Sequence, residues 1–250
     1  MSTELRSKTV RALGYLGVAG ALGKVISLGT TLILARILSP ADYGLMALAV
    51  VVVGFIGFFN EVGIGSAIVQ KPDPSKEEVN GCFAIAMAIS VLLCGATVLL
   101  ADLMASFFGN PKLGPMISVL ASVFVLGAVG TVPLAFLRKT MNFRVIGAIN
   151  TLAILIQSAA CLVLAWLGYG VWSLVASFVV ASVVQSVGAF LLSPWRPRGR
   201  YGVREALGLV NYGLQITMTR VFWYLYMNVD KVIIGRVIGS RAVGIYDMAF

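Results

Sequence analysis

Long apolar segments follow one another along this chain almost without interruption, and each is long enough to cross a lipid bilayer as a helix. A hydrocarbon core about 30 Å thick needs about 20 residues at a helical rise of ~1.5 Å per residue. The breaks between the segments contain proline, glycine and asparagine, and they are too short to hold an extramembrane domain. We therefore predict an all-α fold, a polytopic membrane helical bundle. The predicted segments cover residues 13–38, 44–69, 80–106, 113–137, 145–167, 171–193 and 207–238, and an eighth begins near Gly244.

The amino-acid composition supports a helical membrane protein. The chain is 59% hydrophobic and 12% charged, whereas a soluble domain is about 25% charged. A transmembrane β-barrel would show alternating hydrophobicity in segments of ~10 residues, and that alternation is not seen. The predicted helical bundle therefore rests on composition as well as on segment length.

Basic residues gather on one side of the predicted topology, and this orients the bundle. If the N-terminus is cytoplasmic, the far side of the membrane receives Arg36, Lys112, Arg236 and Arg241 alone. An excess of Lys and Arg marks the cytoplasmic side, so we predict a cytoplasmic N-terminus. The formal net charge of +9 then follows from topology, and no nucleic-acid partner is expected. The cytoplasmic side receives Arg6, Lys8, Arg11, Lys71, Lys76, Arg138, Lys139, Arg144, Arg196, Arg198, Arg200 and Arg204.

The chain lacks histidine and the residue patterns that are typical of catalytic and metal sites. It contains no histidine, which is the commonest general base and the commonest metal ligand. Cys82, Cys94 and Cys161 lie in apolar segments without a paired-cysteine motif, which is typical of packing residues. The loops show no paired carboxylates, no nucleophile beside a base and no phosphate-binding glycine motif. We therefore predict no enzyme activity, no catalytic residue, no metal site and no cofactor.

The chain contains an internal repeat at an offset of 200 residues, because residues 32–44 align without gaps with residues 232–244. The segment from residue 207 onward is then the start of a second copy. We predict an N-terminal transmembrane lobe of six helices at 1–193, a basic cytoplasmic linker at 194–206, and the beginning of a second lobe at 207–250. The identical pairs are Ile33/Ile233, Arg36/Arg236, Gly44/Gly244 and Ala49/Ala249.

Several ionisable residues lie within apolar segments and are the candidate site residues. Ionisable groups at membrane depth are costly and usually face a protein interior or a water-filled cavity. At ~100° per residue, Arg220, Tyr224 and Lys231 share one face of the segment 207–238. In the structural alternative, Arg220 pairs with Glu61, and charges near helix ends extend to the membrane surface. The candidates for lining a central cavity are Lys24, Glu61, Arg220, Tyr224, Asp230 and Lys231.

Glycine is frequent in the second and fourth predicted segments, and the fourth also contains Pro133. Small residues let helices approach closely, whereas proline frees a carbonyl and bends a helix. Close packing is the ordinary interpretation, and bending points for alternating access are the functional alternative. The glycines are Gly54, Gly57, Gly63, Gly65, Gly127 and Gly130.

Five stretches of the chain together resemble one family, the polysaccharide transporter branch of the multidrug/oligosaccharidyl-lipid/polysaccharide exporter superfamily. The resemblance implies a flippase that moves undecaprenyl-pyrophosphate-linked oligosaccharides across the bacterial inner membrane for lipopolysaccharide or exopolysaccharide synthesis. It also implies two six-helix lobes around a central cavity, so this chain is expected to be part of a longer protein. Implied partners are the lipid-linked oligosaccharide, membrane lipids and other polysaccharide-assembly proteins. The stretches are residues 34–44, 63–70, 136–144, 168–175 and 228–236.

In this interpretation, Lys24 and Arg220 attract the pyrophosphate of the lipid carrier while its prenyl tail stays in the membrane. A small-molecule antiporter of the same superfamily is the nearest alternative, and it would use Glu61 or Asp230 as its titratable carboxylate. A membrane-bound sugar transferase or polymerase is the alternative from another class.

Overall fold

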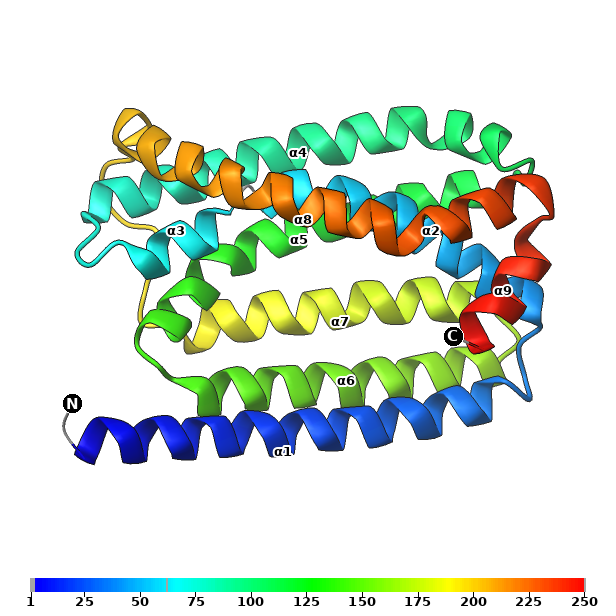
Figure 1. Cartoon of the computed structure of the whole chain (residues 1–250), viewed down its shortest axis with the longest axis horizontal. Coiled ribbons are helices and arrows are strands. Elements are labelled where there is room, and N and C mark those ends of the chain that lie inside the picture. The colour runs from blue at the N-terminus through cyan, green and yellow to red at the C-terminus, as the bar shows by residue number, and fades with distance from the viewer. Residues whose placement is uncertain (1–2, 62, 250) are drawn as a thin grey trace.

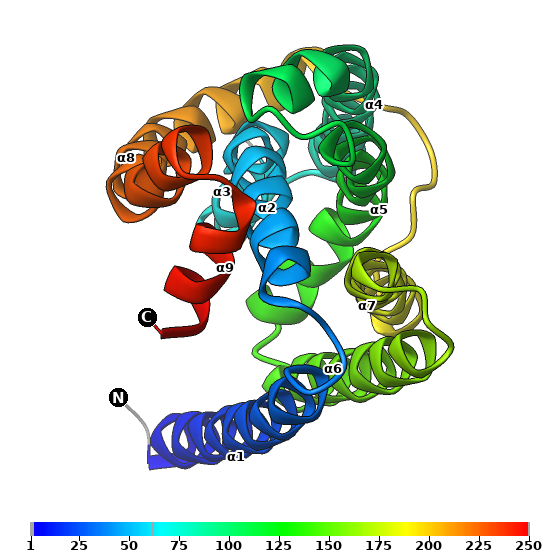
Figure 2. The same ribbon diagram turned by 90° about the vertical axis from the view of Figure 1, so that its right-hand side faces the viewer.

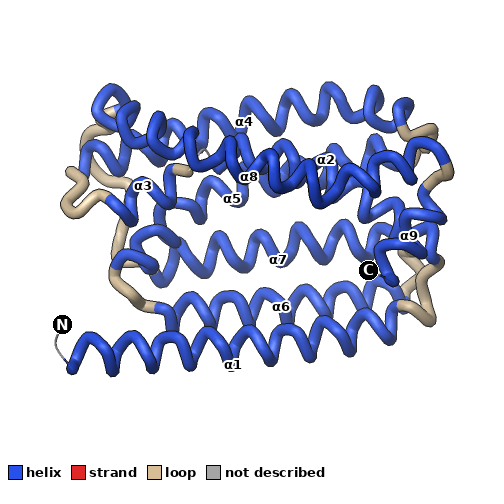
Figure 3. Tube along the Cα trace, in the orientation of Figure 1, coloured by secondary structure: helices blue, strands red, loops and turns tan. Residues whose placement is uncertain are grey.

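The computed structural model describes residues 3–61 and 63–249, and it describes side chains for residues 17, 20–60, 63–208 and 221–249. All regular secondary structure in these residues is helical (Figure 3), which confirms the predicted all-α class. The helices are α1 (Thr3–Leu34), α2 (Pro40–Glu61), α3 (Ile64–Gln70), α4 (Lys76–Phe107), α5 (Leu113–Lys139), α6 (Phe143–Trp166), α7 (Val171–Leu192), α8 (Val203–Val237) and α9 (Ser240–Ala249).

The long helices run side by side along the long axis of the molecule (Figure 1). Among the described residues, α2, α4, α5, α6 and α7 are long and apolar enough to cross a membrane. The chain is therefore a multi-pass membrane protein, as the sequence predicted. We call the end formed by residues 71–75, 140–142 and 193–202 the basic end, and the other end, formed by 35–39, 108–112, 167–170 and 238–239, the opposite end. The cytoplasmic location of the basic end remains a prediction from the positive-inside rule.

Seen from the opposite end, the helices form an open curve (Figure 2). Along this curve α1 packs on α6, α6 on α7, α7 on α5, and α5 on α4. Helix α2 lies within the curve, where it contacts α5, α8 and α9.

The prediction of one continuous helix over residues 44–69 is wrong. The structure divides it into α2 and the short α3, with Gly63 between them at a φ of 60°. A positive φ is a conformation that glycine adopts without the steric cost of a Cβ atom. At the other end of the chain, α9 begins at Ser240 and not near Gly244, because Gly239 at a φ of 109° lets the chain turn immediately after α8.

Helix α5 runs without interruption through Pro133. Nearby, Gly130 packs on α7: a Cβ atom added there would lie 3.3 Å from the Cα of Ser186. The contact supports close helix packing as the role of this glycine.

Helices α2 and α9 meet at two glycines that are partners in the internal repeat. A Cβ atom added to Gly44 would lie 1.7 Å from the carbonyl oxygen of Ser240, and one added to Gly244 would lie 1.7 Å from that of Pro40. Residues 40 and 240 are also related by the offset of 200 residues. The contact is therefore reciprocal between positions that the predicted repeat pairs, and the second copy itself stays a prediction.

The linker that precedes α8 is fixed to neighbouring helices. The guanidinium of Arg196 donates hydrogen bonds to the carbonyls of Phe190 and Ser193, both at 2.7 Å, near the C-terminal end of α7. The side chain of Asn80 on α4 donates to the Arg198 carbonyl at 2.7 Å. These hydrogen bonds hold the backbone of the basic linker in one conformation against α4 and α7.

A buried polar contact joins three helices in the middle of the bundle. The side-chain amide of Asn60 on α2 donates to the Phe124 carbonyl of α5 at 3.1 Å, and the Ser90 hydroxyl of α4 donates to the amide oxygen of Asn60. Hydrogen bonds between helices in membranes contribute about 0.6 kcal/mol on average and up to ~1.7 kcal/mol. The contact therefore adds modestly to stability and fixes how the helices align.

We expect Asn60→Leu to lower the free energy of unfolding by about 1 kcal/mol, because it leaves the Phe124 carbonyl without its buried donor. Thermal unfolding in detergent measures the change. Ser122→Ala is the matched control, since the Ser122 hydroxyl bonds within its own helix, to the Val119 carbonyl. Equal unfolding temperatures for the two variants would contradict the assignment.

Candidate functional site

A polar groove lies along α1 where it packs on α6, and residues of α2 and α7 also line it. This α1 groove has a volume of about 380 Å³. Its α1 residues recur at intervals of three and four, which places them on one face of the helix. The groove is lined on α1 by Gly20, Gly23, Lys24, Ser27, Thr30, Thr31 and Leu34, and on the other helices by Tyr43, Met46, Ile154, Gln157, Ser158, Cys161, Leu174, Ser177 and Phe178.

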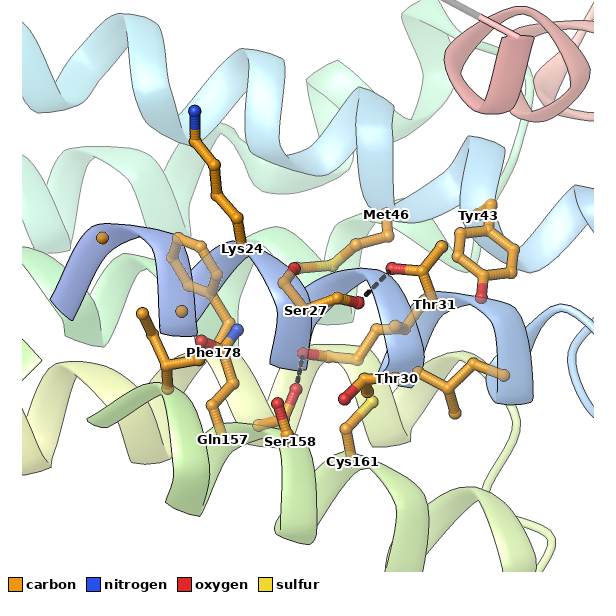
Figure 4. A pocket seen from close by; sticks show the side chains of 16 residues that line it. Lys24, Ser27, Thr30, Thr31, Tyr43, Met46, Gln157, Ser158, Cys161 and Phe178 are labelled. Atoms are coloured by element: carbon orange, nitrogen blue, oxygen red, sulfur yellow. Dashed lines mark hydrogen bonds between the residues drawn. The ribbon is translucent and has the colours of Figure 1, made fainter. Parts of the chain in front are cut away.

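Hydroxyl and amide groups gather on this groove from two helices (Figure 4). The Thr30 hydroxyl donates to the Ile26 carbonyl at 2.8 Å, and the Thr31 hydroxyl donates to the Ser27 carbonyl at 2.9 Å. Gln157 and Ser158 of α6 point toward α1 from the other side. Such groups are able to exchange hydrogen bonds with a polar ligand, because their oxygen atoms retain free acceptor positions.

The predicted site residue Lys24 lies on the α1 groove. Its side chain extends from α1 toward α2 (Figure 4). Its ammonium makes no hydrogen bond or ion pair with any described residue. The structure thus places one predicted cation on a polar cavity wall, where its charge is available to a ligand.

Glu61 and Arg220 lie outside the residues whose side chains are described. Glu61 is the last residue of α2, and Arg220 lies within α8. Their proposed contributions to a cavity, and their alternative pairing with each other, stay predictions.

Tyr224 is placed in a contact between α8 and α2. Its hydroxyl donates to the carbonyls of Val51 at 3.1 Å and Val50 at 3.3 Å. Its ring lies edge-on to that of Phe58, with 5.0 Å between the centroids. A Cβ atom at Gly54 would lie 2.4 Å from the Tyr224 hydroxyl oxygen, so this glycine makes room for the tyrosine.

Asp230 and Lys231 are placed between α8 and α9. The Tyr246 hydroxyl donates to the Asp230 carboxylate, and the Lys231 ammonium pairs with the Asp247 carboxylate. Neither residue lines the α1 groove. The structure therefore does not bring Lys24 together with the three described candidates on α8.

A second polar cavity lies at the basic end, between α3, α5 and α7. It has a volume of about 250 Å³, and we call it the Arg138 cavity. Sequence reasoning assigned Arg138 to topology alone and missed this location. The available signal was the spacing of Gly127, Thr131 and Arg138, which fall near one face of α5. The polar residues that line it are Ser66, Thr131, Arg138, Ser182, Gln185 and Ser186.

A third cavity, of about 230 Å³, lies between the other two. It shares Phe178 with the α1 groove, and it shares Val123, Gly127 and Thr131 with the Arg138 cavity. The three cavities therefore follow one another along the inner side of the bundle. Within the described part of the chain, no group of three or more Cys, Asp or Glu residues lies close enough together to hold a metal ion.

Comparison with known proteins adds independent information. The model of a family described as polysaccharide biosynthesis protein matches residues 33–250. The chain is 27% identical to the succinoglycan biosynthesis transport protein ExoT of Rhizobium meliloti (strain 1021), over 100% of this chain and 51% of that protein. It is 25% identical to the lipopolysaccharide biosynthesis protein WzxC of Escherichia coli (strain K12), over 99% of this chain and 51% of that protein.

A more distant relative is the teichuronic acid biosynthesis protein TuaB of Bacillus subtilis (strain 168), which is 21% identical over 76% of this chain and 40% of that protein. The chain spans about half the length of ExoT and WzxC. No solved structure matches it significantly.

Proposed function

This chain belongs to the polysaccharide biosynthesis protein family, and we propose from that premise that it forms part of a transporter carrying lipid-linked oligosaccharides across the bacterial inner membrane. One relative is named as a transport protein, and the relatives' names include succinoglycan, lipopolysaccharide and teichuronic acid biosynthesis. All three names refer to the biosynthesis of such a polymer. Those names support export of a saccharide in preference to a small-molecule antiporter or a sugar transferase.

The observation that carries the proposal is the polar α1 groove with Lys24 on its wall, where the ammonium has no partner among the described residues. An oligosaccharide is rich in hydroxyl groups, which would exchange hydrogen bonds with the serine, threonine and glutamine side chains of the groove. A charge at this depth is costly unless it faces a polar cavity. We assign to Lys24 the attraction of the phosphate groups that link a saccharide to its lipid carrier.

Lys24→Gln is expected to lower export about tenfold or more, with normal amounts of protein in the membrane. Hydrogen bonds to charged groups contribute about 1.5–3 kcal/mol, and about 1.4 kcal/mol corresponds to a factor of ten. Lys24→Arg should retain part of the activity because it keeps the charge. Cell-surface polysaccharide, measured in a host whose export depends on the protein, gives the result.

Lys76→Gln is the matched control, because Lys76 is exposed at the start of α4 and lines none of the three cavities. It should export normally. Normal export by Lys24→Gln, at wild-type protein levels, would show that this cation has no part in transport.

A further inference from the structure

Arg138 lines the Arg138 cavity. The proposed role of Lys24 in transport does not involve this arginine, and the packing of the helices does not explain it. Arg138 lies in the last turn of α5, and its side chain lines the cavity at the basic end. The guanidinium makes no hydrogen bond or ion pair with any described residue. Its charge is therefore available to a ligand that enters the cavity.

Neighbouring cations at the same end are used differently. The Lys139 ammonium donates to the Lys71 carbonyl at 2.5 Å and to the Ile68 carbonyl at 3.4 Å, so it stabilises the end of α3. The Lys71 ammonium pairs with Glu78 at 2.6 Å. Arg196 donates to backbone carbonyls at the end of α7. These residues hold the fold together, whereas Arg138 faces a cavity.

Neutral hydrogen-bonding groups accompany Arg138 on the cavity wall. Ser182, Gln185 and Ser186 come from successive turns of α7, and Thr131 comes from α5, two turns before Arg138. Gly130 and Ser186 hold these two helices close together, with 3.3 Å between the Cα of Ser186 and a Cβ atom added to Gly130. The groups thus lie on two helices whose separation is fixed, which suits recognition of a compact polar ligand.

We propose that the Arg138 cavity binds a phosphate ester at the basic end of the bundle. Arginine recognises phosphate through two parallel hydrogen bonds, and the hydroxyl and amide groups of α7 supply further donors to the remaining oxygen atoms. A carboxylate on the cavity wall would oppose an anion, and every described residue that lines the cavity is neutral or basic.

The inference rests on the proposed function, because a lipid-linked saccharide carries its phosphate groups at the membrane surface where this cavity lies. Anchored there, the ligand would occupy one end of the series of cavities that continues to the α1 groove. The phosphate of a membrane phospholipid headgroup has the same chemistry. The experiment below distinguishes the two sources.

Binding of farnesyl pyrophosphate to the purified protein in neutral detergent tests the site. Arg138→Gln should weaken this binding at least tenfold, Arg138→Lys should weaken it less, and Ser186→Ala should weaken it a few-fold. Arg204→Gln is the matched control, because Arg204 is an exposed basic residue at the same end that lines none of the described cavities, and it should change binding less than twofold. Unfolding temperatures measured alongside show whether each variant remains folded.

Competition identifies the source of the phosphate. Displacement of farnesyl pyrophosphate by inorganic pyrophosphate, but not by excess phosphatidylglycerol, assigns the cavity to a pyrophosphate-linked carrier. Equal displacement by phosphatidylglycerol, lost in Arg138→Gln, assigns it to lipid headgroups. Unchanged binding in a folded Arg138→Gln protein, or equal losses in Arg138→Gln and Arg204→Gln, would overturn the proposal.

Transport measured in proteoliposomes, with the complete transporter of which this chain is proposed to form part, separates this inference from the proposed function. If only the Arg138 site is wrong, the wild-type protein moves a lipid-linked oligosaccharide and Arg138→Gln binds farnesyl pyrophosphate as the wild type does. If the proposed function is wrong, the wild-type protein moves no such substrate, although its binding of farnesyl pyrophosphate still depends on Arg138.

Discussion

Gly44→Ala is expected to destabilise the protein by about 3 kcal/mol or more, at the upper end of the usual 1–3 kcal/mol for overpacking. The added methyl group would lie 1.7 Å from the Ser240 carbonyl oxygen and 2.8 Å from the Gly244 nitrogen. Both are backbone atoms, so no side-chain rotation relieves the overlap. Helices α2 and α9 have to separate, and thermal unfolding in detergent measures the loss.

Gly244→Ala should have a similar effect, because its methyl group would meet the Pro40 carbonyl oxygen at 1.7 Å. The double variant should lose clearly less stability than the sum of the two single losses. Once either methyl group has separated the helices, the second finds space already open, and residues in contact are not additive. Gly57→Ala is the control on the same helix, since its methyl group would make only an ordinary contact at 3.8 Å with the Phe124 ring. Wild-type stability in Gly44→Ala would show that α2 and α9 do not approach this closely.

Gly81→Ala is expected to cost about 2–3 kcal/mol and to loosen the linker before α8. The added methyl group would lie 2.2 Å from the Gly202 carbonyl oxygen. The linker backbone is held at that point by the hydrogen bond from the Gly202 amide to the Glu77 carbonyl at 2.9 Å, and by the Asn80 side chain. Moving the linker away therefore breaks hydrogen bonds as well as contacts.

Limited trypsin digestion, together with thermal unfolding, reports both effects, because Arg198 and Arg200 supply cleavage sites in the linker. Digestion there should be faster in Gly81→Ala than in the wild type. Gly95→Ala on the same helix is the matched control: nothing lies within 4 Å of its added methyl group. It should raise stability by up to about 1 kcal/mol through helix propensity. If the two variants behave alike, the close approach of α4 to the linker is not present.

The sequence predicted that a charged residue lines a polar cavity, but it predicted only some of the residues and their positions. Lys24 was found from the sequence because a lone charge in an apolar segment is conspicuous, and it does lie on a polar cavity wall. Arg138 was counted with the basic loops, since its place near a helix end looks the same whether it faces water or a cavity. Lys231 shares its chemistry with Lys24 but pairs with Asp247 of α9, a contact that helix periodicity does not predict.

The sequence alone determined that this protein is a helical membrane bundle. Within a bilayer, backbone polar groups have to be paired inside each segment, so apolar segments of this length have to form helices. The predicted repeat pairs Gly44 with Gly244, and the structure has these two residues in direct contact. The break at Gly63 was not predicted, because glycine in an apolar segment is compatible with close packing as well as with a turn.

Only the tertiary structure decided which face of each helix lines the cavities. In a soluble protein the apolar face identifies the interior, but lipid is as apolar as the interior of a membrane protein, so hydrophobic patterning does not distinguish the two. Helical periodicity fixes which residues share a face, and the rotation of that face toward a neighbour depends on side-chain packing between helices. For that reason the sequence predicted Lys24 and Lys231 in one cavity, whereas the structure has Lys24 on the α1 groove and Lys231 in an ion pair with Asp247.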